Sequence, residues 1–522
     1  MIDSKNNNID IADEVEGEDY ILIDQKDFGV NEECGVIGIF SPEKKPLARD
    51  IYFGLFALQH RGQESAGIAC SYNSDKIAYY KNMGLVSEVF KDEEIDLLPE
   101  TNTAIGHVRY STGGTSNVIN AQPVVFFGKY GRMAVAHNGN IINARSIREK
   151  MIQEGHIFQS SRDVEVVAAI INDTGMQKPE DGIFEGCKQL EGAYAMVFLA
   201  AGKLIAIRDP RGFRPLIMGK KGNDIIFASE SCALDAIDAK IIRDVEAGEM
   251  IVVDTDGSIT TRTLPNVHKK PCIFEFVYLA RSDSTMDGIS VYDSRYESGK
   301  KMAELFKIDA DIVSGVPDSA VVTARGYSVV SGLPYVDALS KNRYVGRTFI
   351  QPTQLQRESS VKVKLNAFKA NIRGKRLVLI DDSIVRGTTS KKIIQLLRAS
   401  GAKEVHMLVA SPIVKYPCYF GVDMDTRDQL IGGYRNAEEI REIIGADSLQ
   451  YIPLEVLKNA CGGRDYCTGC FNRDYSIDVS HLCETDALET RTCCDVEEYN
   501  PTLSAAHYDL LHNNSGVKRR YI

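Results

Sequence analysis

Two adjacent carboxylates followed by a loop of small residues form the most distinctive chemical pattern in this 522-residue chain. Asp381 and Asp382 come directly after an apolar run, 377–380, that predicts a buried parallel strand. The small-residue loop 387–390 then opens a segment with apolar residues at helical spacing, 393–397. Free backbone N–H groups at such a helix start bind phosphate, and an acidic pair suits ribose hydroxyls and Mg²⁺. The stretch therefore predicts a site for a phosphorylated ribose.

A Rossmann-type strand that ends in a solvated acidic pair is the alternative interpretation. A Walker A site is disfavoured, because G-x-x-x-x-G-K-[ST] occurs nowhere in the chain. Residues 376–390 resemble, over their whole length, the phosphoribosyl pyrophosphate (PRPP) signature of type I phosphoribosyltransferases. This resemblance implies that Asp381 and Asp382 hold the ribose hydroxyls and, with Ser319, a Mg²⁺ ion. The residues that it implies for the 5′-phosphate are Arg386, Gly387, Thr388, Thr389 and Ser390.

Two further segments belong with this predicted site. Residues 311–319 predict a strand that enters a tight turn, and the ends of parallel strands meet at one edge of a sheet. Ser319 is therefore expected to reach pyrophosphate or Mg²⁺, with a plain β-turn as the alternative. The basic, Gly-punctuated loop 341–352 could close over pyrophosphate and exclude water, or be a solvated loop.

The first half of the chain offers a different chemistry, built around a thiol. Cys34 stands directly before a strand-like apolar run, where a buried structural role is the ordinary interpretation. Arg109 ends a predicted strand and could clamp a carboxylate, although strand-end arginines mostly form surface ion pairs. Asn138 and Gly139 predict a turn whose amide groups could hold an oxyanion, although such pairs are often only turns. Asp163 could pair with an α-ammonium group.

As a set, these motifs resemble the glutaminase domain of class II amidotransferases, which are N-terminal-nucleophile enzymes. The similarity covers roughly residues 34–254. It implies that Cys34, freed by removal of 1–33, is the nucleophile and that its own α-amino group is the general base. It also implies that Asn138 and Gly139 form the oxyanion hole. Arg109 is implied to bind the carboxylate of glutamine, and Asp163 its ammonium group.

Both halves in this order, together with loop 341–352, resemble the family of glutamine phosphoribosylpyrophosphate amidotransferases over about 33–471. The resemblance implies an αββα glutaminase sandwich followed by an α/β type I phosphoribosyltransferase domain. The expected organisation is an acidic propeptide at 1–33, a glutaminase domain at 34–265, a phosphoribosyltransferase domain at 266–473 and a tail at 474–522.

The implied reaction converts glutamine, PRPP and water to 5-phosphoribosylamine, glutamate and pyrophosphate, the first committed step of de novo purine (IMP) biosynthesis. Ammonia released at Cys34 would pass to PRPP, and a closed path suits this transfer because free ammonia is mostly protonated at neutral pH. The resemblance assigns loop 341–352 and Tyr110 to that path. It also implies feedback inhibition by purine nucleotides and a homotetramer.

Twelve cysteines in a chain of this length indicate metal or thiol chemistry rather than a disulfide framework. Cys467 and Cys470 form a C-x2-C knuckle, for which zinc is the first interpretation and a redox pair the second. One subgroup of the amidotransferase family carries a [4Fe–4S] cluster. That resemblance implies four ligands: Cys272, Cys418, Cys467 and Cys470.

The match to that subgroup has one departure and several competitors. The family follows the knuckle with Phe-Thr-Gly, whereas Phe471 is followed here by Asn472 and Arg473. The other late cysteines, which could compete as ligands, are Cys461, Cys483, Cys493 and Cys494.

Charge and composition narrow the functional class further. The net charge is −11, of which −9 falls within residues 1–33, so the rest of the chain is nearly neutral and has no basic stripe for nucleic acid. No uncharged apolar run reaches 18 residues, and the acidic N-terminal segment is unlike a signal peptide. A cytoplasmic enzyme is therefore expected.

Two other functions share part of the pattern. A glucosamine-6-phosphate synthase has the same glutaminase half, but it needs sugar-isomerase repeats after residue 270, and the acidic pair at 381–382 speaks against them. A purine-sensing regulator that binds PRPP without catalysis would be expected to have lost Cys34 or Arg109, and both are present.

Overall fold

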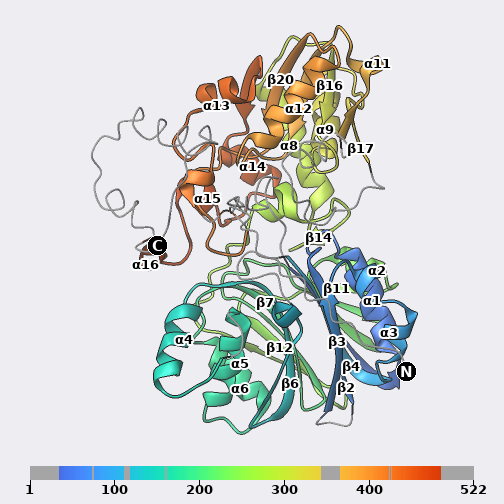
Figure 1. Ribbon diagram of the computed structural model, residues 1–522, viewed down its shortest axis with the longest axis vertical. Coiled ribbons are helices and arrows are strands. Elements are labelled where there is room, and N and C mark those ends of the chain that lie inside the picture. The colour runs from blue at the N-terminus through green and yellow to red at the C-terminus, as the bar shows by residue number, and fades with distance from the viewer. Residues whose placement is uncertain are drawn as a thin grey trace, which may run out of the picture.

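The computed structural model describes residues 34–72, 76–110, 118–158, 162–342, 365–422, 424 and 426–483. Its two lobes are stacked along the longest axis in Figure 1, with the N-terminal half of the chain below and the C-terminal half above. Among these residues, no helix has the length and apolar character needed to cross a membrane.

The lower lobe contains two antiparallel sheets. The first has the strand order β11-β9-β10-β1-β4-β2-β3, and the second has the order β13-β12-β8-β7-β6-β5. The strands of the first sheet are β1 (Gly35–Lys45), β2 (Ser65–Tyr72), β3 (Lys76–Met83), β4 (Thr101–Arg109), β9 (Ile217–Lys221), β10 (Asp224–Ala228) and β11 (Lys240–Asp244). Those of the second are β5 (Val124–Gly128), β6 (Gly131–Ile141), β7 (Gly192–Ala200), β8 (Lys203–Arg208), β12 (Glu249–Val253) and β13 (Ile259–Thr263).

The two sheets pack face to face, because alternate side chains of the central strands are apolar on both faces. In β7, Ala195 and Val197 belong to the core between the sheets, whereas Tyr194 and Met196 face the helices outside. Figure 1 shows helices on both outer sides of this sandwich. One set is α1 (Leu47–Ala57), α2 (Val86–Val89), α3 (Asp92–Asp96) and α7 (Ser231–Asp235); the other is α4 (Ala144–Gln153), α5 (Asp163–Asp173) and α6 (Pro179–Cys187). The predicted αββα sandwich is confirmed.

The upper lobe is built on a parallel sheet with the order β16-β19-β20-β21. In β19, Val378 and Ile380 pack on one side in a core with α8 and α9, whereas Leu377 and Leu379 pack on the other with α12 and α13. The predicted α/β domain is confirmed. Its principal elements are α8 (Val291–Leu305), β16 (Ile312–Gly315), α9 (Val321–Ser331), β19 (Arg376–Asp381), α12 (Thr388–Ala399), β20 (Glu404–Val409), α13 (Ala437–Ile444), β21 (Ser448–Tyr451) and α14 (Leu454–Ala460).

Shorter elements connect and flank this sheet. They are the hairpin β14 (Thr285–Met286) and β15 (Ile289–Ser290), the pair β17 (Leu339–Lys341) and β18 (Leu365–Ala367), and the short helices α11 (Lys369–Ile372), η3 (Arg427–Gln429), α15 (Gly469–Asn472) and α16 (Ser480–Cys483). In the lower lobe, the short helix η1 (Val118–Asn120) contacts β3.

One sequence prediction for the upper lobe is wrong. The segment 274–281, which is apolar except for Glu275 and Arg281, predicts a strand. The structure instead forms a π-helix there, η2 (Glu275–Leu279). Ala280 donates its N–H to the Glu275 carbonyl at 3.1 Å, which is the i→i+5 bond of that helix. A short run that is buried all round has no clear period, so periodicity alone cannot separate strand from helix.

Candidate active sites

Strand pairing brings the predicted nucleophile to the predicted carboxylate clamp. Gly35 is paired with Val108 in the β1–β4 ladder, so Cys34 lies beside the end of β4, where Arg109 is fully buried. The Cys34 thiol lies 3.8 Å from the Tyr110 carbonyl. Burial raises the pKa of the Cys34 thiol, although the nearby Arg162 and Arg109 charges oppose that effect. The thiol therefore needs an adjacent base to become a nucleophile at neutral pH.

The Asn138-Gly139 pair does not form the predicted turn. Both residues lie inside β6, paired with Ala195 and Tyr194 of β7. Gly139 has a φ of 138°, and a Cβ at this position would lie 2.0 Å from the Ala193 carbonyl oxygen. The strand can continue through this conformation only because residue 139 is glycine.

The Asn138 amide is placed to serve a ligand. Its side chain is fully buried, and among the described residues neither Oδ1 nor Nδ2 has a hydrogen-bond partner. Buried polar atoms are nearly always bonded, so an amide without protein partners is available to bond to a ligand or a water molecule. A buried N–H donor of this kind suits an oxyanion.

Asp163 begins α5 and is held by backbone donors. Oδ2 accepts from Ile141 N–H at 3.2 Å, and Oδ1 accepts from Val164 N–H at 2.8 Å. Burial favours the protonated form, but the charges of His137 and Arg162, with these bonds, hold the pKa of the Asp163 carboxyl below its ordinary value. The carboxylate is therefore ionised at neutral pH, as binding of an α-ammonium group requires.

The structure adds a carboxylate that the sequence motifs do not assign. Glu64 Oε2 lies 3.5 Å from Arg109 Nη1, and Glu64 N–H donates to the Arg109 carbonyl at 3.0 Å. Only the pairing of β2 with β4, in which Ser65 lies opposite Arg109, brings these residues together. Their separation in the sequence carries no signal of that contact.

In the upper lobe, the predicted acidic pair ends β19 as expected. Asp381 and Asp382 are both buried, and Ser319 and Ser383 each donate a hydroxyl hydrogen bond to the Asp382 carboxylate. Burial raises the pKa of both carboxyls, and the charge of Asp382 raises that of Asp381 further. A buried acidic pair of this kind is stabilised by a hard cation, so the residues present fit Mg²⁺.

Ser319 reaches this pair because β16 and β19 are neighbours. Gly315 is paired with Ile380 in parallel register, and Val316 N–H donates to the Ile380 carbonyl at 2.8 Å. The turn after β16 therefore lies beside the end of β19, at the same edge of the sheet, as the sequence predicts.

The small-residue loop opens the twelve-residue helix α12. Gly387 is its N-cap with a φ of 75°, and a Cβ there would lie 2.4 Å from Ile431 Cδ1. Arg386 is buried and donates to Gln429 Oε1 at 3.0 Å. Thr388 begins the helix and Ser390 is buried, while Thr389 Oγ1 is a buried atom without a hydrogen-bond partner in the described part of the chain. The first turn of the helix offers N–H groups suited to a phosphate.

The predicted lid lies mostly outside the described residues. Only Lys341 and Asn342 of the segment 341–352 are described, and Lys341 Nζ forms an ion pair with Asp318 Oδ2 at 2.9 Å. Positions 343–352 therefore stay a prediction.

Four cysteines from three separate segments of the sequence come together between the lobes. Cys272 and Cys467 form a parallel bridge, in which Cys467 N–H donates to the Pro271 carbonyl at 2.9 Å. Burial raises the pKa of the Cys470 thiol, and interactions with Cys418, Cys272 and Cys467 raise it further. The predicted ligand set is thus a spatial cluster.

The spacing of these thiols bears on the metal. No three of the four sulfur atoms lie within 4.8 Å of one another, and within the described ranges only Glu154, His156 and Asp173 form such a group. Thiolates about 2.3 Å from one Zn²⁺ ion would lie about 3.8 Å apart. The donor set therefore fits a larger cluster better than a single zinc ion.

The competing cysteines are separated from this cluster or lie outside the description. Cys461 is buried in the upper-lobe core, where the Tyr466 hydroxyl donates to its carbonyl. The Cys483 side chain and both Cys493 and Cys494 fall outside the described residues. Cys70, Cys187 and Cys232 are buried in the cores of the lower lobe.

Comparison with known proteins supports the same two-part organisation. Residues 107–236 match the model of the glutamine amidotransferase domain, and residues 298–411 match that of the phosphoribosyl transferase domain. The amidophosphoribosyltransferase of Methanocaldococcus jannaschii is 45% identical over 465 residues, which cover 86% of this chain and 98% of the relative. That of Bacillus subtilis is 42% identical over 459 residues, which cover 86% and 95%.

The chain belongs to the amidophosphoribosyltransferase family.

Two solved structures show the same similarity. One is described as the allosteric regulatory enzyme of purine biosynthesis and has a TM-score of 0.81 at 41% sequence identity. The match covers 85% of this chain and 97% of the chain in that structure. The other is the B. subtilis glutamine PRPP amidotransferase in complex with ADP and GMP, with a TM-score of 0.80 at 41% sequence identity. The match covers 85% of this chain and 98% of the chain in that structure. The predicted amidophosphoribosyltransferase resemblance is confirmed, and the second half matches a phosphoribosyl transferase domain rather than sugar-isomerase repeats.

Proposed function

We propose that the chain hydrolyses glutamine at Cys34 and uses the ammonia to aminate PRPP at the Asp381–Asp382 site, yielding 5-phosphoribosylamine. The observations that carry this proposal are the position of Cys34 beside the buried Arg109 and, in the second sheet of the lower lobe, the buried Asn138 amide that has no partner among the described residues. In the upper lobe, the acidic pair and the helix-start loop lie on one continuous strand–loop–helix segment.

In the glutaminase step, the Cys34 thiol attacks the glutamine amide carbon. The α-amino group of Cys34 accepts the thiol proton and passes it to the leaving nitrogen, so that ammonia departs and a glutamyl thioester remains. Asn138 Nδ2 and Gly139 N–H stabilise the oxyanion, while Arg109 and Asp163 bind the two ends of the substrate. Water then hydrolyses the thioester and releases glutamate.

In the second step, ammonia displaces pyrophosphate at C1 of the ribose. Asp381 and Asp382 bind the ribose hydroxyls, and the residues from Arg386 to Ser390 bind the 5′-phosphate. Mg²⁺, which Asp381, Asp382 and Ser319 would hold, supplies positive charge to the leaving pyrophosphate when bound. The segment 341–352 and Tyr110 would shield the ammonia from water.

We assign Cys272, Cys418, Cys467 and Cys470 to a structural [4Fe–4S] cluster, because four thiolate ligands leave no open position for substrate chemistry. Support comes from the clustering and wide spacing of the four thiols. Iron and sulfide analysis of anaerobically purified protein tests the assignment: about four of each per chain is expected, and stoichiometric zinc instead would overturn it.

The same proposal includes several properties that follow from the family. They are removal of 1–33 to free Cys34, domain limits of 34–265 and 266–473, feedback inhibition by purine nucleotides, a homotetramer and a cytoplasmic location. Inhibition by nucleotides is supported by the complex of the B. subtilis relative with ADP and GMP.

Replacing Cys34 by Ala tests the proposal directly. The variant is expected to lose glutamine-dependent synthesis of phosphoribosylamine and to keep synthesis from added ammonia, because the two sites are separate. Replacement of the buried lower-lobe thiol Cys70 by Ala is the control and should retain both activities. Equal loss of both nitrogen sources in C34A would contradict separate sites, and active protein whose N-terminus precedes Cys34 would contradict the amine base.

A further inference from the structure

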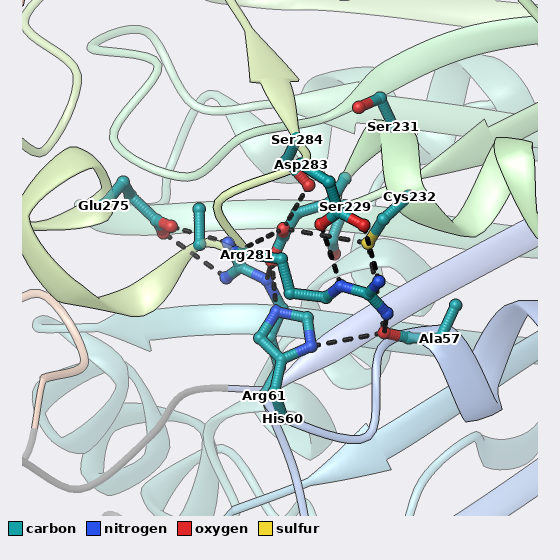
Figure 2. Close-up of polar contacts among 12 residues, drawn as sticks. Ala57, His60, Arg61, Ser229, Ser231, Cys232, Glu275, Arg281, Asp283 and Ser284 are labelled. Atoms are coloured by element: carbon teal, nitrogen blue, oxygen red, sulfur yellow. Dashed lines mark hydrogen bonds and ion pairs between the residues drawn. The ribbon is translucent and has the colours of Figure 1, made fainter. Parts of the chain in front are cut away.

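A buried carboxylate of the upper lobe lies between two arginines of the lower lobe. Glu275 begins η2 and is 2% exposed, while Arg61 and Arg214 are 1% and 0% exposed. Arg61 donates from Nη2 to Glu275 Oε2 at 2.5 Å and from Nη1 to Oε1 at 3.4 Å. Arg214 Nη1 donates to Oε1 at 3.4 Å. Figure 2 shows the Glu275 carboxylate pointing at the Arg61 guanidinium.

Arg61 in turn supports one flank of the glutamine site. Its Nε donates to Glu230, which also accepts from His60 and Ser284, so the guanidinium is held from both sides (Figure 2). The next residue is Gly62, and a Cβ there would lie 2.6 Å from Arg109 N. The turn that Arg61 anchors is therefore packed directly on the backbone of the carboxylate clamp.

Arg214 supports the opposite flank. Its Nη2 donates to the Phe420 carbonyl, and Phe420 stacks on Phe213 with ring centroids 4.3 Å apart. A Cβ on the following residue, Gly421, would lie 3.3 Å from the carbonyl carbon of Gly139. The upper-lobe loop that Arg214 holds is thus packed against the oxyanion-hole glycine.

A second bond fixes the same loop beside the oxyanion hole. Asn140 follows Gly139 in β6, and its Nδ2 donates to the Tyr419 carbonyl at 2.8 Å. The loop 419–421 therefore contacts β6 through both a side chain and the backbone.

We propose that Glu275 is a positioning residue for glutamine hydrolysis. By holding Arg61 and Arg214 together, it keeps one turn pressed on Arg109 and one loop pressed on Gly139, so a single upper-lobe carboxylate orients both ends of the lower-lobe site. The inference rests on the proposed roles of Arg109 and Gly139. Glutamine at position 275 would keep the shape but leave two buried guanidinium groups without their shared anion, and both flanks would loosen.

Glu275→Gln in the full chain tests this inference by steady-state kinetics. We expect kcat/KM for glutamine to fall at least about tenfold, because the loosened oxyanion flank lowers kcat and the loosened carboxylate clamp raises KM. The rate with added ammonia should be retained, which also reports that the variant is folded. Arg214→Lys keeps the charge but cannot reach both Glu275 and Phe420, and it should show the same selective loss.

Asp287→Asn is the matched control. Asp287 is another buried upper-lobe carboxylate, and it binds the buried Arg208 of the lower lobe through two bonds of 3.0 Å. It bonds to neither Arg61 nor the Arg214 side chain, so D287N should weaken the contact between the lobes without changing the ratio of glutamine-dependent to ammonia-dependent rates.

Two results would overturn the inference: an unchanged ratio in E275Q, or an equal fall of the ratio in D287N. Failure of the proposed function would be seen in the wild-type chain, as no PRPP amination with either nitrogen source, and would overturn the inference with it. Failure of the inference alone would leave wild-type activity intact.

Discussion

At the scale of single residues, the candidate glutamine site is built from buried polar side chains. Arg109 is fully buried, and its carboxylate neighbour Glu64 lies 3.5 Å away. Asn138 is fully buried, and no described residue bonds to its amide. Burying the Asn138 amide costs about 1–3 kcal/mol unless a ligand satisfies it, so this side chain is expected to serve the substrate rather than stability.

Replacing Asn138 by Ala should lower kcat for glutamine hydrolysis by about 10² to 10³ and leave KM nearly unchanged, because an oxyanion donor acts mainly in the transition state. Ammonia-dependent synthesis should be unaffected. The side chain of Asn143 bonds to backbone groups of Gln189 and Glu191 among the described residues, so N143A offers the control. A large rise in KM with unchanged kcat would assign Asn138 to substrate binding instead.

Replacing Asp382 by Asn should lower amination of PRPP by at least about 10² with either nitrogen source, because the acidic pair serves the step that both share. The control is Asp311→Asn, since Asp311 lies just before the start of β16, at the opposite end of the same sheet, and pairs with Arg376. Initial rates with glutamine and with ammonia measure both variants. Loss of the glutamine-dependent rate alone would place Asp382 outside the PRPP site.

At the scale of elements, the short helix α15 ends where the sequence departs from the motif expected by resemblance. Arg473 is its C-cap, with a φ of 67° in the left-handed region, at the position where the expected motif has glycine. A side chain in this conformation costs about 1 kcal/mol relative to glycine. Arg473 therefore occupies a backbone conformation that glycine would adopt without this cost.

Arg473→Gly should be more stable than Arg473→Ala by about 1 kcal/mol, because both variants lose the guanidinium and only glycine relieves the backbone. For a domain of roughly 200 residues this corresponds to about 2–4 °C in the midpoint of thermal unfolding. Scanning calorimetry of the two variants under identical conditions measures the difference. Equal midpoints would show that the left-handed conformation is not maintained at residue 473.

At the scale of the whole molecule, buried charge pairs join the two lobes. Glu275 lies between Arg61 and Arg214, and Asp287 accepts two bonds from Arg208. Such pairs contribute little to stability relative to apolar packing, but removal of one partner leaves an uncompensated buried charge. They therefore favour one relative placement of the lobes over others.

The contribution of Asp287 should depend on pH. Burial opposes ionisation, but Arg208 and Lys269 hold the pKa of the Asp287 carboxyl below its ordinary value of 3.8. A carboxyl with a lowered pKa stabilises the folded state above its unfolded pKa, and this stabilisation is lost as the pH falls through the folded pKa. The free energy of unfolding of the wild type should exceed that of D287N by about 3 kcal/mol at pH 7. This difference in free energy should become smaller as the pH falls below about 4.

Thermal unfolding of both proteins between pH 7 and pH 3 measures this difference. The control is Asp283→Asn, because the Asp283 side chain is 57% exposed and pairs with the half-exposed Arg281. That substitution should have little effect at any pH. If the difference in unfolding midpoint between wild type and D287N stayed constant down to pH 3, the pH-dependent stabilisation could not be assigned to the Asp287 carboxylate.

The sequence by itself determined the features that depend on neighbouring residues. The acidic pair, the small-residue loop and α12 are contiguous, so strand, loop and helix start could be predicted together. Cys34 before a buried strand and Arg109 at a strand end were local signals of the same kind. Local signals failed where burial removed the period, as at Glu275–Leu279, or where an Asn-Gly pair stayed within a strand, as at Asn138 and Gly139.

Only the tertiary structure decided which distant groups meet. Arg61 and Glu275 are 214 positions apart, and their contact exists because η2 of one lobe packs on the turn after α1 of the other. The four cysteines are likewise gathered from separate segments by the packing of both lobes. Pattern and propensity act over a few residues, whereas these contacts depend on how whole domains close on each other, which no short stretch of sequence encodes.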